Sequence, residues 1–142
     1  MTLQHCTAHI AKGYLDAIAF TESDIDLFED HTHIEADKKA VLNATCIAGH
    51  FYNNNSELVD NYASVLVSKG AVENLDNAFQ RIGHELWLTS QRHSSGFWDN
   101  GYHEGLEKQL TEISVRYEYD VEVDVGESDG EFTLHLQPDK IK

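Results

Sequence analysis

The sequence predicts one α+β domain over residues 1–142, with about five helices and a C-terminal antiparallel β-hairpin packed against them. Through most of the chain, apolar residues recur every three or four positions, which is typical of amphipathic helices. Near the C-terminus the period changes to two, which indicates strands. The one proline is Pro138, so proline interrupts none of the helical segments. A length of 142 residues is also usual for a single domain.

Successive stretches carry the helical period. The expected helices run from Leu3 to near Phe20, from about Thr32 to Tyr52, from Ser56 to near Gly70, from Leu75 to Leu88, and from Leu106 to Ile113. Thr32 to Glu35 matches a capping box, which predicts the start of the second helix. The polar run Asn53–Ser56 predicts a break before the third helix, and Gly70 is expected to close that helix.

The C-terminal segment alternates between apolar and polar residues. Val121, Val123 and Val125 are separated by acids, Ser128-Asp129-Gly130 predicts a turn, and alternation resumes at Phe132. This pattern predicts a hairpin with one apolar and one polar face. A lone hairpin is marginal in water, so we expect it to lie against the helices or to join other strands.

The chain is strongly acidic. Twenty-five acidic and ten basic residues give a formal net charge of −15 with histidine neutral. A field of this sign repels nucleic-acid phosphates and anionic membrane surfaces, so the charge argues against direct nonspecific binding to either. It attracts a partner protein with a basic surface. The alternative is that the charge only keeps the protein soluble.

Part of this charge lies on the first hairpin strand. Asp120, Glu122 and Asp124 are expected on one face of that strand, at intervals of about 6.6–6.8 Å. A DNA-mimicking inhibitor needs such a row, because the protein it blocks recognises a line of phosphates. The alternative is that the outer face of a hairpin is polar in any case and that acids protect a strand edge from aggregation.

Compartment and cysteine state follow from simple patterns. Met1 to His9 lacks the basic and apolar regions of a signal peptide, and no apolar run is long enough for a membrane span. The sequence therefore predicts a cytoplasmic protein. Cys6 and Cys46 lie in helical patterns, where free cysteines packed in the core are expected rather than a disulfide.

The candidate binding residues of the loop region lie between Gly83 and Asp99. This segment holds both tryptophans, and its candidates are His84, Trp87, Arg92, His93, Phe97, Trp98 and Asp99. Aromatic side chains on an irregular loop either fill the core or form a binding surface. In the first case, Trp87, Phe97 and Trp98 clamp the loop to the domain. In the second they line a pocket, where His93 and Asp99 are a candidate general acid–base pair.

Two runs in this segment resemble a known family. Gly83-His84-Glu85-Leu86-Trp87-Leu88-Thr89 and His93-Ser94-Ser95-Gly96-Phe97-Trp98-Asp99 are similar to the signature of small, largely uncharacterised proteins encoded by phages, prophages and plasmids. The similarity extends into the fifth expected helix and the first hairpin strand, and weakly to Tyr14–Ala17, which together make about half of the chain. The resemblance implies a mobile-element origin and a bacterial host cytoplasm, and it implies no particular activity.

Complete catalytic and metal motifs are missing from the sequence. His5 and His9 are four residues apart on the first expected helix and can share one metal ion, but spacing fixes no third ligand. His84 and Glu85 lack the second histidine of a His-Glu-x-x-His helix, and there is no phosphate-binding glycine loop. The sequence therefore predicts no metal and no cofactor.

Two functions remain from these observations, beside a purely structural or accessory role in a virion. The first is a non-catalytic acidic protein from a phage or similar element that binds a host protein, with a nucleic-acid-handling or defence protein as the expected target. It would use the acidic surface and the loop around Trp98. The second is a small enzyme or ligand-binding domain whose site is the His84–Asp99 segment.

Overall fold

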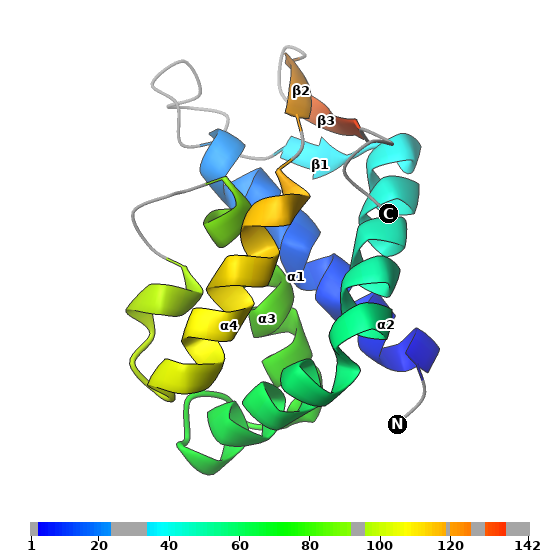
Figure 1. Ribbon diagram of the computed structural model, residues 1–142. Helices are drawn as coiled ribbons and strands as arrows, with labels where there is room; N and C mark the ends of the chain where they lie inside the picture. The colour runs from blue at the N-terminus through cyan, green and yellow to red at the C-terminus, as the bar shows by residue number, and fades with distance from the viewer. Residues whose placement is uncertain (1–2, 24–33, 92–95, 119, 126–129, 136–142) are drawn as a thin grey trace.

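The computed structural model describes residues 3–23, 34–91, 96–118, 120–125 and 130–135 (Figure 1). The α-helices of this part of the chain are α1 (Leu3–Ser23), α2 (Lys38–Ser68), α3 (Leu75–Ser90) and α4 (Glu104–Ser114). Single 3-10 turns, η2 (Phe97–Asp99) and η3 (Val115–Tyr117), flank α4. The strands are β1 (Ile34–Ala36), β2 (Asp120–Val125) and β3 (Gly130–His135).

The predicted α+β class with about five helices is wrong, because the described chain is mainly helical and has four α-helices. In place of a hairpin that packs alone on the helices, the strands form a small mixed sheet in the order β1-β3-β2. β3 pairs in parallel with β1 and antiparallel with β2. Figure 1 shows this sheet at one end of the helical body, near the start of α2. The strands therefore cover an end of the helices and form no full layer.

The second and third expected helices are one helix with a kink. Within α2, Asn55 has non-helical backbone angles of φ −140° and ψ 28°. The side-chain amides of Asn54 and Asn55 donate to the carbonyls of His50 and Phe51, four residues earlier. These bonds occupy carbonyls near the kink, so the polar run bends the helix and does not end it.

The start of α2 also differs from the prediction. Residues Ile34–Ala36 form β1, so the predicted capping box at Thr32 to Glu35 does not start the helix. Asp37 is the N-cap instead, and its Oδ1 accepts from the amide of Ala40 at 2.8 Å. At the other end, Gly70 has a φ of +75° directly after the C-cap Lys69. Gly70 therefore closes α2, as predicted for the expected third helix.

Two glycines bring α1 and α3 into backbone contact. A Cβ atom on Gly13 would lie 1.7 Å from the carbonyl oxygen of Gln80, and one on Gly83 would lie 1.9 Å from that of Ile10. Only glycine permits so close an approach of two helices. The helices run in the same direction, because α1 meets α3 near both of their starts and both of their ends.

The core lies between α1, α2 and α3. Its largest fully buried side chains include Trp87, Tyr14, Tyr62, Phe51 and Phe97. Cys6 is buried as predicted, whereas Cys46 is exposed, so the prediction that both cysteines pack in the core is wrong for Cys46. None of the described helices combines the length and apolar character that a membrane span requires.

Candidate functional site

The structure separates the aromatic residues of the Gly83–Asp99 segment. Trp87 and Phe97 are buried in the core, at 1% and 0% exposure, whereas Trp98 is 52% exposed. Asp99 is exposed beside Trp98, and His84 is partly buried on α3. Arg92 and His93 lie outside the described residues, and with them the candidate His93–Asp99 pair. Trp87 and Phe97 therefore fill the core, and Trp98 is the aromatic side chain of the segment that reaches the surface.

Hydrogen bonds connect the described residues of the two sequence runs. The indole Nε1 of Trp87 donates to Thr21 Oγ1 on α1 at 3.0 Å. Thr89 Oγ1 accepts from the buried amide of Phe97 at 3.1 Å. A Cβ atom on Gly96 would lie 2.5 Å from that same hydroxyl, so a side chain at Gly96 would disturb the bond. Thr89, near the end of α3, is thus held against the start of η2.

A pocket opens along the contact between α1 and α3. Its volume is about 410 Å³, and its lining residues are Gly13, Asp16, Gln80, Arg81, His84 and Glu85. The sequence had singled out His84, but it gave no sign that Asp16 of α1 lies beside it. Gly13 lines the pocket at the level where Gly13 and Gly83 bring the two helices into backbone contact.

Glu85 is the most unusual group in this pocket. Its side chain is 8% exposed, and its Oε1 accepts from Arg81 Nε at 3.3 Å. Its Oε2 is buried and has no hydrogen-bond partner among the described residues. Burial raises the pKa of Glu85, and the nearby Arg81 opposes this only in part. A carboxyl group of this kind can accept or donate a proton toward a small polar ligand.

His84 completes the polar side of the pocket. Its Nδ1 lies 4.0 Å from Glu85 Oε1. Burial lowers the pKa of His84, and the positive charge of Arg81 lowers it further. The imidazole is therefore mainly neutral at neutral pH, and it can offer one donor and one acceptor.

Arg81 links the pocket to a network of hydrogen bonds that ends at the buried Glu107 of α4. Its Nη2 donates to Asn100 Oδ1 at 3.2 Å, and its guanidinium lies 5.9 Å from the ring centre of Tyr102. Asn100 donates to the hydroxyl of Tyr62, which donates in turn to Glu107 Oε2 at 2.8 Å. The same Glu107 oxygen accepts from the amide of Tyr102 at 2.9 Å. Sequence reasoning missed this network, since its members come from separate segments.

We expect the stability of the protein to depend on pH, because Glu85 is buried. Folding raises the pKa of this carboxyl above its ordinary value of 4.5, so folding favours the protonated form. The favourable contribution is complete below pH 4.5 and is lost as the pH rises through the folded pKa. The unmodified chain should therefore lose stability relative to Glu85→Gln as the pH rises from about 4.5 toward neutrality.

Denaturant unfolding of both chains at several pH values measures this effect. Glu112→Gln, which alters an exposed carboxyl on α4, is the matched control and should show no comparable trend. A stability difference between the unmodified chain and Glu85→Gln that does not change with pH would contradict the raised pKa.

The candidate acidic residues Asp120, Glu122 and Asp124 occupy alternate positions of β2. In the antiparallel register they lie opposite His135, Thr133 and Glu131 of β3. The structure describes the backbone of β2 but not these acidic side chains. The acidic row therefore lies in a strand, and the face of the sheet on which its side chains lie stays a prediction.

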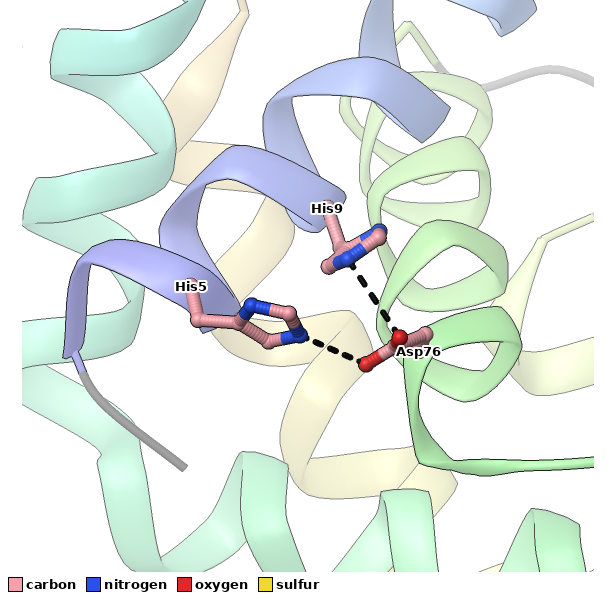
Figure 2. A group of neighbouring side chains, drawn as sticks. All are labelled: His5, His9 and Asp76. Carbon is pink, nitrogen blue, oxygen red and sulfur yellow. Dashed lines mark hydrogen bonds and ion pairs between the residues drawn. The ribbon is translucent and has the colours of Figure 1, made fainter.

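One group of described residues has the composition of a metal site. His5 and His9 on α1 meet Asp76 on α3, and one potential ligand atom from each residue lies within 4.8 Å of the others. Figure 2 shows both imidazoles directed toward the carboxylate of Asp76. The sequence identified the histidine pair but not Asp76, which belongs to a helix about seventy residues later.

Comparison of the chain with protein-family models, with curated proteins and with solved structures found no match. Its function is therefore inferred from its own residues.

Proposed function

We propose that this chain is a non-catalytic acidic protein that binds a partner protein with a basic surface. The observation that carries the proposal is Trp98, which is 52% exposed on a turn that is otherwise anchored in the core. The resemblance to phage and plasmid proteins makes a bacterial host protein the expected partner, such as a nucleic-acid-handling or defence protein.

The turn that carries Trp98 is well suited to binding. Phe97 is fully buried, and the amides of Asp99 and Asn100 bond the carbonyls of Gly96 and Phe97. Because these contacts fix the turn, little backbone entropy is lost when a partner covers Trp98. Tryptophan is also enriched among residues that dominate the energy of protein interfaces.

The charge of the chain supports a basic partner. A net charge of −15 accelerates association with a basic surface and makes the complex sensitive to salt. The alternating acids of β2, Asp120, Glu122 and Asp124, are the candidates for a row that imitates nucleic-acid phosphates. A partner that normally binds DNA or RNA would recognise such a row.

We expect Trp98→Ala to weaken this complex about thirtyfold or more, the loss typical of a central interface residue. The partner is first captured from nuclease-treated bacterial lysate at low salt, released at high salt and identified. Its affinity for the unmodified chain and for Trp98→Ala is then measured with both proteins purified. Replacement of Asp120, Glu122 and Asp124 by Asn or Gln should weaken binding and flatten its salt dependence.

Leu75→Ala is the matched control, because Leu75 is an exposed apolar residue at the start of α3, at 40% exposure, and belongs to neither the Trp98 turn nor the sheet. Its affinity for the partner should equal that of the unmodified chain. Equal affinities of Trp98→Ala and the unmodified chain would exclude Trp98 from the interface. Binding that does not change with salt would exclude the acidic surface.

A small-molecule site is the second candidate. It is favoured by the buried, unpartnered Oε2 of Glu85 beside the pocket between α1 and α3. The ligand would be small and polar, with a hydrogen-bond donor for Glu85. If no specific partner is retained at low salt, this pocket becomes the preferred site.

A further inference from the structure

We propose that His5, His9 and Asp76 form a binding site for a divalent transition-metal ion of the Zn²⁺ type. The inference is independent of the proposed partner binding, because the three residues belong to neither the Trp98 turn nor β2. It departs from the expectation of no metal, which arose because spacing fixes no third ligand for the histidine pair.

The position of the ligands follows from the fold. His5 and His9 are four residues apart on α1, so their side chains share one face of the helix. Asp76 lies in the first turn of α3. Gly13 and Gly83 hold α1 and α3 in backbone contact further along the same pair of helices. The backbone therefore brings the three residues together before any metal arrives.

The potential ligand atoms of the three residues lie within 4.8 Å of one another, close enough for small rotations to bring them around one ion. His5 Nε2 lies 2.7 Å from Asp76 Oδ1, and His9 Nε2 lies 3.7 Å from Asp76 Oδ2 (Figure 2). In a tetrahedral site with bonds of about 2.0–2.1 Å, ligand atoms are about 3.3 Å apart. Small side-chain rotations can produce that spacing, because the side chains of His5 and Asp76 are each more than 40% exposed.

The ligand types indicate which metal fits. Two imidazoles and one carboxylate suit zinc and neighbouring first-row metals, whereas calcium and magnesium prefer oxygen ligands alone. Three protein ligands leave a position for water, an arrangement that zinc adopts readily. The chain charge of −15 also raises the local concentration of cations.

Gln80 supplies support behind one ligand. Its side-chain amide lies 3.0 Å from His9 Nδ1. If His9 binds a metal through Nε2, its proton resides on Nδ1, and the amide of Gln80 can turn so that its oxygen accepts that proton. Such a bond fixes the ring and is usual behind metal-binding histidines.

The test uses the full chain without an affinity tag, freed of metal by a chelator. We expect calorimetry to show one Zn²⁺ per chain, and Co²⁺ to give the visible absorption of a low-coordinate site. Gln80→Ala should weaken Zn²⁺ binding about tenfold to hundredfold. His9→Asn and Asp76→Asn should each weaken it more. Zn²⁺ should raise the Tm of the unmodified chain but not of these two variants.

Two control variants are matched to the ligands. His103→Asn removes an exposed histidine and leaves a good capping residue at the start of α4, where His103 is the N-cap. Glu112→Gln removes an exposed carboxylate. Both should bind Zn²⁺ like the unmodified chain. Absence of Zn²⁺ binding would overturn the proposal, and so would equal binding by the unmodified chain, His9→Asn and Asp76→Asn. Circular dichroism confirms that each variant is folded.

Discussion

Gly83→Ala is expected to lower the free energy of unfolding by about 3 kcal/mol, because the added methyl group cannot fit between α1 and α3. Its Cβ would lie 1.9 Å from the carbonyl oxygen of Ile10 and 2.9 Å from the amide nitrogen of Tyr14. Both neighbours are backbone atoms, so no side-chain rotation can relieve the overlap. The two helices would have to move apart and would lose contacts along their length. Gly13→Ala should behave in the same way against Gln80.

Denaturant unfolding, followed by circular dichroism, measures this loss. Gly49→Ala is the matched control, since Gly49 is also helical and its added Cβ would meet only Thr7 Cγ2, at an ordinary 3.8 Å. That substitution should stabilise the chain by about 0.5–1 kcal/mol, because alanine loses less conformational entropy in a helix. If Gly83→Ala is as stable as Gly49→Ala, the backbones of α1 and α3 do not approach each other as closely as described.

Glu107→Ala should cost about 2–4 kcal/mol of stability. The side chain of Glu107 is almost fully buried and accepts from the Tyr62 hydroxyl and the Tyr102 amide. Each buried donor left without an acceptor costs about 1–3 kcal/mol. Burial raises the pKa of Tyr62, so this hydroxyl stays protonated at neutral pH and needs its acceptor.

Glu107→Gln provides the comparison, because it keeps one acceptor oxygen at the same position. It should retain most of the stability that Glu107→Ala loses. Glu112→Ala, at an exposed position of the same helix, controls for helix propensity and should change stability by less than about 0.5 kcal/mol. A small effect of Glu107→Ala, similar to that of Glu112→Ala, would show that the network contributes little to stability.

The helices were largely predictable, because apolar periodicity records a buried face. The periods of α3 and α4 and the positive φ of Gly70 follow from the local sequence. The polar run before Ser56 misled the prediction, since local composition does not reveal that both halves of α2 face one core. β1 was missed because a three-residue strand depends on pairing with β3, almost one hundred residues later.

The candidate sites were less predictable than the helices. The sequence identified Trp87, Phe97 and Trp98 but could not assign them to core or surface, since aromatic side chains are common in both. It identified His5 and His9 as a pair, yet Asp76 joins them only through tertiary structure. Pockets and networks built across helices leave no spacing pattern in a sequence.

The contact between α1 and α3 also constrains how the protein folds during synthesis. The residues that α1 meets on α3 come 66 to 73 positions later in the chain. Contacts of such high sequence separation slow folding relative to helical bundles with local contacts. The apolar face of α1 therefore stays uncovered by α3 until that helix, which ends at Ser90, has emerged from the ribosome. Chaperone protection of the nascent chain matters most in that interval.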